Sequence, residues 1–104
     1  MAVEAIIFVQ SVRTAISMGA ARAASMIAAA ESGLPIFEYA PKKVKKAVVG
    51  NGNADKAQVA FMIRALLGLS ETPAHDAADA LAVAMAHLSA SDPLKAKLLD
   101  RKKI

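Results

Sequence analysis

The sequence predicts a predominantly helical α/β fold in the order β-α-β-α-α-α, with two short parallel strands. Three observations predict it. Residues 3–9 form a short apolar run of β-branched and aromatic side chains, which is typical of a buried strand. A helix of roughly 22 residues follows, between a capping Ser11 and Gly33, and a second strand-like run comes directly after it. A strand, a crossover helix and a second strand form a parallel pair.

Local signals set the limits of the first three elements. The first strand, Val3 to Val9, contains one charged residue, Glu4. Ser11 is a preferred N-cap and Gly33 is a helix stop, so the first helix lies between them. The second strand is expected at Leu34 to Tyr39. Because two strands form only a marginal sheet, we expect the later part of an α/β domain rather than all of it.

The rest of the chain is predicted to be helical and then polar. Pro41 opens a short basic helix, and Asn53 can cap the helix after it. The last helix of the chain carries two aspartates in its first turns. The three helices are expected at about residues 41–49, 54–67 and 75–89. We therefore place one partial domain at residues 1–90 and a polar, basic tail at residues 91–104.

Composition limits the class of protein. The 104 residues are enough for one domain at most. No apolar run approaches the ~20 residues that a membrane span needs, and no signal peptide is visible after Met1. The chain has no Cys, which excludes a disulfide framework and fits a reducing compartment. We therefore expect a cytoplasmic protein without a membrane partner.

The strongest chemical signal is a pair of carboxylates, Asp76 and Asp79, on an otherwise apolar helix. Residues three apart share a helix face, so the two charges are expected to point the same way. Unpaired charges on a buried face are costly, whereas a divalent cation would offset their repulsion. The alternative is an acidic first turn that complements the helix dipole. The pattern alone leaves both interpretations open.

A series of short motifs in a fixed order indicates a family. Each motif is weak alone, but their order and spacing together are specific. The matching stretches are Val3–Glu4, Ser11–Ala15, Gly19–Ala23, Gly33–Pro35, Val44–Gly52, Ala54–Val59 and Asp76–Ala82. From Ala2 to about Leu88, the chain resembles the RuvC Holliday-junction resolvases, which have the ribonuclease H-like fold.

The resemblance implies a magnesium-dependent site. In that family four acidic residues hold two magnesium ions, and Glu4, Asp76 and Asp79 match three of them. These three are the expected catalytic and metal-binding residues. The fourth, an Asp in an Asp-x-Gly motif of the first strand, has no counterpart, since only three residues precede Glu4. We therefore expect the chain alone to be inactive and to bind metal weakly or not at all.

The implied reaction is hydrolysis of a DNA phosphodiester, in which two metals ~3.5–4 Å apart activate water and stabilise the leaving oxygen. Lys45 and Lys56 match positions that contact DNA in the family, and Lys46 and Lys42 would extend the patch. The alternative is a solvated basic helix. Phe8 lies one residue from the family's aromatic position, which can stack at the junction centre. It is a DNA-binding candidate and equally a candidate core residue.

Charge and a stripe of small residues point to partners. The chain has 13 basic and 9 acidic residues, and a basic exterior around an acidic centre suits a polyanionic substrate. The resemblance implies that this substrate is branched DNA, in recombination and repair. The first helix carries small residues along one stripe, and in the family the equivalent helix lies at the dimer interface. The stripe consists of Ala15, Gly19, Ala23 and Ala30, beside Met18, Met26 and Ile27.

Two alternatives stay open. The stripe could pack on its own sheet instead of on a second copy. The whole chain could be a non-catalytic dimerisation or DNA-binding module of the same fold. A homodimer or higher oligomer is expected, and a branch-migration helicase is a further candidate partner.

Overall fold

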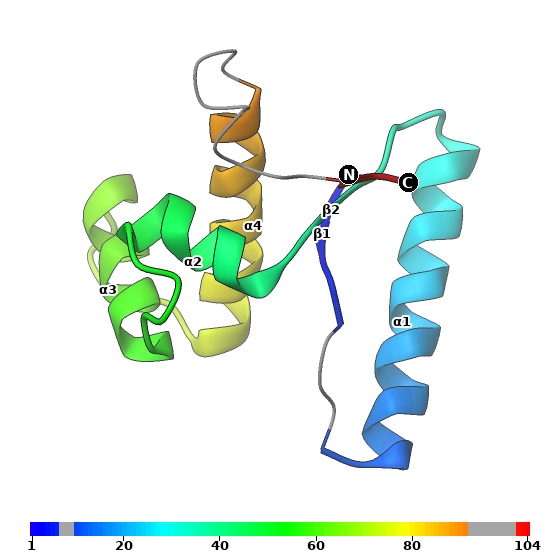
Figure 1. Ribbon diagram of the computed structural model, residues 1–104, viewed down its shortest axis with the longest axis horizontal. Helices are drawn as coiled ribbons and strands as arrows, with labels where there is room; N and C mark the ends of the chain where they lie inside the picture. Colours follow the sequence, from blue (N-terminus) through cyan, green and yellow to red (C-terminus); the bar gives the residue numbers. More distant parts are fainter. Residues whose placement is uncertain (7–9, 92–101) are drawn as a thin grey trace.

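The computed structural model describes residues 1–6, 10–91 and 102–104 (Figure 1). The predicted order of strands and helices is confirmed, and one short strand follows it. The elements are β1 (Ala2–Glu4), α1 (Val12–Glu31), β2 (Phe37–Tyr39), α2 (Pro41–Val49), α3 (Lys56–Leu67), α4 (His75–Ala90) and β3 (Lys102–Lys103). Among the described residues, no helix combines the length and the apolar character that a membrane crossing needs.

The sheet has the strand order β1-β2-β3. The predicted parallel pair is confirmed, with Ala2 opposite Phe37 and Glu4 opposite Tyr39. The third strand, β3, was not predicted and pairs antiparallel with β2. Its position is fixed by backbone contacts, such as the Ile104 N–H that donates to the Ile36 carbonyl at 2.8 Å. A Lys-Lys dipeptide carries no apolar alternation, so the tail gave no local strand signal.

Helix limits follow their capping residues. The Ser11 side chain caps α1 as predicted, by accepting from the Thr14 N–H at 3.1 Å. The predicted cap of α3, Asn53, was wrong. Asp55 caps that helix, and Asp55 and Gln58 form a reciprocal capping box with bonds of 2.8 and 2.9 Å. The Asn53 N–H instead bonds the Asn51 side chain within the preceding turn.

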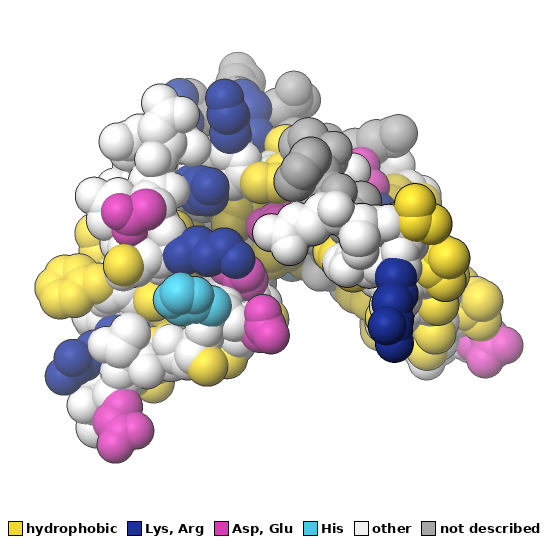
Figure 2. Space-filling view, turned by 90° about the horizontal axis from the view of Figure 1, so that it is seen from below, with side chains coloured by type: hydrophobic (Ala, Val, Ile, Leu, Met, Phe, Trp, Pro, Cys, Tyr) yellow, Lys and Arg dark blue, Asp and Glu magenta, His cyan; other side chains and the backbone are white. Residues whose placement is uncertain are grey.

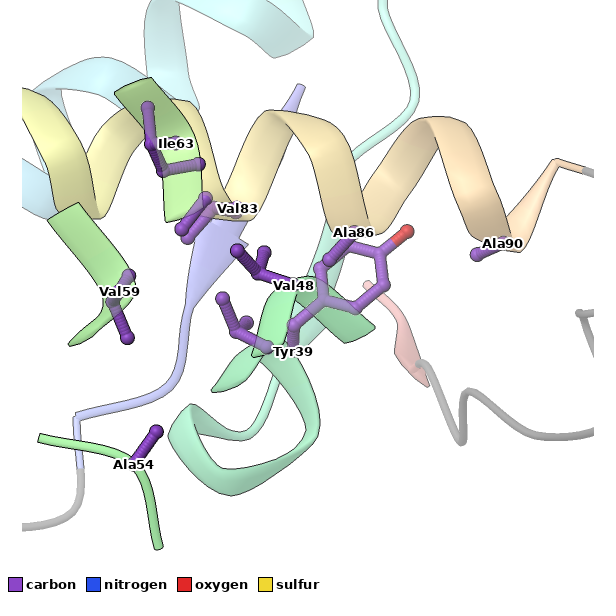
Figure 3. Close-up of a cluster of buried hydrophobic side chains, with 10 residues drawn as sticks. Tyr39, Val48, Ala54, Val59, Ile63, Val83, Ala86 and Ala90 are labelled. Atoms are coloured by element: carbon purple, nitrogen blue, oxygen red, sulfur yellow. The ribbon is translucent and has the colours of Figure 1, made fainter. Parts of the chain in front are cut away.

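The core lies between β2 and the helices α2, α3 and α4 (Figure 3). The inward face of α4 is built from alanines at every fourth position, so α2 and α3 can approach it closely. Tyr39 and Ile63 are the largest fully buried side chains and fill the space beside these alanines. The buried alanines of α4 are Ala78, Ala82, Ala86 and Ala90.

Helix α1 stands on the other side of the strands from α2, α3 and α4 (Figure 1). Of its 20 residues only Ala29 is buried. An ion pair between Arg22 of α1 and Glu38 of β2 ties the helix to the sheet. Of the predicted stripe, Gly19, Ala23 and Ala30 are exposed, whereas Ala15 and the adjacent Met26 are half-buried.

Candidate active site

Two carboxylates from distant parts of the sequence meet where β1 approaches α4. Glu4 is the last residue of β1, and Asp79 lies in the second turn of α4. Both line a pocket of about 140 Å³ together with Lys45 of α2 and Lys56 of α3. The pocket therefore places two carboxylates and two ammonium groups in one small space.

The helices position these side chains from buried neighbours. Asp79 follows the buried Ala78, which puts it at the edge of the inward face of α4, where it is half-buried. Lys45 follows the buried Val44 in the same way on α2. Lys56 is the first residue of α3, directly after the Asp55 cap. Each charged group thus lies at the rim of the core.

The electrostatics agree with the closeness of the two carboxylates. The Glu4 residue is exposed, but the surrounding protein still removes part of the water around its carboxylate. This desolvation raises the pKa of Glu4, and the nearby charge of Asp79 raises it further. Lys45 and Lys56 act in the opposite direction and favour the ionised carboxylate. The site therefore contains a like-charge repulsion that its lysines offset in part.

A second, larger pocket of about 460 Å³ shares Glu4 and Asp79 and extends toward α1. Arg22 and Ser25 of α1 line it, and neither was a predicted site residue. Their spacing of three on α1 was the available signal, because it puts both on one helix face. Figure 2 shows basic, acidic and His side chains gathered on one face of the molecule, beside a hollow that separates this region from α1.

The other predicted site residues are not brought into the small pocket. Asp76 and Lys46 are exposed and line neither of the two pockets that Glu4 lines. Asp76 shares a helix with Asp79 but lies one turn nearer the N-terminus of α4. Phe8 lies outside the described residues.

The donors fit a hard divalent cation in kind, because carboxylate oxygens are the ligands that Mg²⁺ prefers. The repulsion between Glu4 and Asp79 is a feature that a cation would relieve. The number of donors is too small for a complete metal site. Within residues 1–6, 10–91 and 102–104, no three His, Asp or Glu side chains gather closely enough to hold a metal.

Similar proteins point to one family. Residues 1–87 match the family model described as "Crossover junction endodeoxyribonuclease RuvC". A protein of that name from Akkermansia muciniphila is 65% identical over 104 residues, which is 100% of this chain and 62% of the relative. A protein of the same name from Pelotomaculum thermopropionicum is 54% identical over 87 residues, 83% of this chain and 53% of the relative.

Solved structures agree. The structure of Thermus thermophilus RuvC superposes with a TM-score of 0.74 at 38% identity, over 97% of this chain and 58% of that one. The same protein in complex with a Holliday junction substrate gives a TM-score of 0.79 at 38% identity, over 97% and 59%. The chain thus spans between half and two thirds of the length of these proteins.

We predict that Glu4→Gln stabilises the metal-free protein slightly at neutral pH. Because the folded-state pKa of Glu4 is raised, its ionisation favours the unfolded chain. The stability that Glu4 contributes is complete below its ordinary pKa of about 4.3 and is lost as pH rises through the raised value. The gain at pH 7 should be no more than about 1 kcal/mol, since the side chain is exposed.

Thermal unfolding of both proteins between pH 3 and pH 8 measures this, and the difference should vanish at the acid end. Glu71→Gln, which removes an exposed carboxylate in the loop before α4, is the matched control. A Glu4→Gln variant less stable than wild type at pH 7 would contradict the prediction.

Proposed function

The chain belongs to the RuvC family of crossover junction endodeoxyribonucleases, and we propose that it forms the metal- and DNA-binding part of a Holliday junction resolvase. In this proposal, the resolvase is a magnesium-dependent, structure-selective endonuclease that acts in recombination and repair in the cytoplasm. The observation that carries the proposal is the pocket in which Glu4 and Asp79 meet Lys45 and Lys56. Carboxylates that bind a cation, beside ammonium groups that bind a phosphate, suit the hydrolysis of a polyanion.

In this proposal Glu4 and Asp79 hold a divalent cation, and Asp76 completes the set of carboxylates that the chain itself supplies. Glu4 and Asp79 arrive from a strand end and a helix turn that the core fixes against each other. When bound, magnesium would activate the attacking water and stabilise the leaving 3′-oxygen. The exposed position of Asp76 means that it must turn toward Glu4 and Asp79 to take part.

Lys45 and Lys56 have a separate role, which is to bind and orient the DNA backbone. Both ammonium groups border the acidic pair, so a phosphate held by them would lie beside Glu4 and Asp79. Lys46 is exposed on the same helix as Lys45 and extends the basic surface. Branched DNA is the proposed substrate, which agrees with the complex of Thermus thermophilus RuvC with a Holliday junction substrate.

We also propose that the chain associates through α1. Its exposed apolar side chains include Val12 and Ile16, at 77% and 68% exposure, and isolated helices gain little stability without a partner. Gly19 faces open space on this surface, because a Cβ added there would meet no atom within 4 Å. A two-fold dimer suits a four-way junction, which needs two symmetric cuts. A branch-migration helicase is proposed as a further partner of the assembled enzyme.

The 104-residue chain alone should not resolve junctions. Its three candidate carboxylates are fewer than the four that the family uses, and only two of them share a pocket. Incubation with a synthetic four-way junction and Mg²⁺, followed by denaturing electrophoresis, tests this. Paired symmetric nicks would refute the prediction. DNA binding without cleavage would also be the behaviour of a non-catalytic module of this fold.

Lys45→Ala and Lys56→Ala should each weaken binding to a four-way junction. Each should also reduce the slope of log K against log salt by about 1, because one phosphate contact is lost. Fluorescence anisotropy over about 50–200 mM salt measures both quantities. Lys103→Ala removes an equal charge from β3, outside the pocket, and is the control. Unchanged affinity in the Lys45/Lys56 double variant would show that this basic surface is only solvated.

The protein should not be a monomer at tens of micromolar. Light scattering is expected to give at least twice the mass of one chain. Gly19→Leu should shift it toward the monomer while stabilising α1 by up to about 1 kcal/mol through helix propensity. Leu88→Glu changes an exposed apolar residue of α4 instead and should leave the mass unchanged. A wild-type mass of a single chain would exclude the dimer.

A further inference from the structure

A polar contact inside the core joins β2 to α4. The Tyr39 side chain is fully buried, and its hydroxyl lies 2.6 Å from Nδ1 of His87. The two rings meet edge to face, with centroids 5.9 Å apart and an interplanar angle of 81°. The His87 ring also lies 5.1 Å from that of Phe37, another β2 residue. The side chain of His87 is therefore held by β2 in both position and orientation.

Each end of this contact leads to one of the two carboxylates. Tyr39 stands opposite Glu4 in the parallel register, and the Ala5 N–H donates to the Tyr39 carbonyl at 2.8 Å. His87 lies two helical turns from Asp79 on α4. The buried Val83 lies between them, four residues from each. Residues four apart share a helix face, so Asp79 and His87 point toward the same side of α4. Figure 3 shows the Tyr39 ring beside Ala86 of α4.

We propose that Tyr39 and His87 are positioning residues, whose hydrogen bond fixes the sliding position of α4 along β2 and so the separation of Glu4 and Asp79. The inference rests on the proposed function, in which these two carboxylates share a divalent cation. Tyr39 and His87 line neither of the two pockets that Glu4 and Asp79 line. The buried alanines of α4 have no side-chain atom beyond Cβ with which to set the height of the helix, whereas a hydrogen bond of this kind has one favourable geometry.

The first experiment measures Mg²⁺ binding by calorimetry at a temperature where every variant is folded. Tyr39→Phe keeps the ring and removes only the hydroxyl. It should weaken Mg²⁺ binding about threefold to tenfold, the range expected for losing one hydrogen bond. His87→Asn offers a polar group near the position of Nδ1 and should bind nearly as wild type, whereas His87→Leu should behave like Tyr39→Phe. Ile63→Val lowers stability at another core site and should leave the affinity unchanged.

The second experiment contains no metal. The chain has no native Cys, so Glu4→Cys with Asp79→Cys introduces a single thiol pair. A short bis-maleimide should link the pair several-fold faster in the Tyr39 background than with Tyr39→Phe, and Ile63→Val should not change the rate.

The two experiments separate the two ideas. If wild type binds no Mg²⁺, the metal part of the proposed function fails, and the cross-linking rates still decide the positioning role. Equal cross-linking rates with Tyr39 and with Tyr39→Phe overturn that role. A loss of Mg²⁺ affinity in Ile63→Val as large as in Tyr39→Phe also overturns it, because general destabilisation would then explain the effect.

Discussion

The arrangement of the molecule depends on how closely α4 can approach its neighbours. Ala78, Ala82, Ala86 and Ala90 give this helix a face without bulk, and α2, α3 and β2 fill the space against it. Larger side chains on that face would force α4 outward, because packed interiors accommodate extra methylenes poorly. Since Asp79 lies at the edge of the same face, the alanines also bring a carboxylate to the strand end that carries Glu4.

The candidate site contains a local electrostatic conflict. Two like charges are held near each other, which the raised pKa of Glu4 reflects, and two lysines lie within the same pocket. A sequence selected only for stability would have replaced one of these carboxylates with a neutral side chain. The conflict is tolerated because Glu4 is exposed and Asp79 only half-buried, so water still solvates both.

Much of the fold could be predicted because its signals are local. Ser11 and Pro41 mark helix starts through their own capping and backbone preferences, and the structure agrees with both. Strand β3 could not be predicted, because it forms through a long-range backbone pairing with β2. Two lysines give no sequence signal for a strand. The true cap of α3 could have been predicted in place of Asn53, because Asp55 and Gln58 have the spacing of a capping box.

The site was less accessible to sequence reasoning. Helical spacing put Asp76 and Asp79 on one face but could not say how α4 is rotated, and in the structure only Asp79 lines the pocket. The position of Glu4 beside Asp79 came from the family resemblance, since no spacing links residues so far apart. Whether the carboxylates bind metal, and whether Phe8 contacts DNA, stay predictions.

The weak attachment of α1 has a consequence for how the chain is handled in a cell. Helix α1 buries a single residue and is tied to the sheet by the ion pair of Arg22. Its unwinding would break few tertiary contacts, so α1 forms a unit of low local stability. An uncovered α1 is therefore the natural entry point for proteases, and its apolar side chains are the natural target of chaperones. In the proposed dimer, a second copy covering α1 would protect it from both.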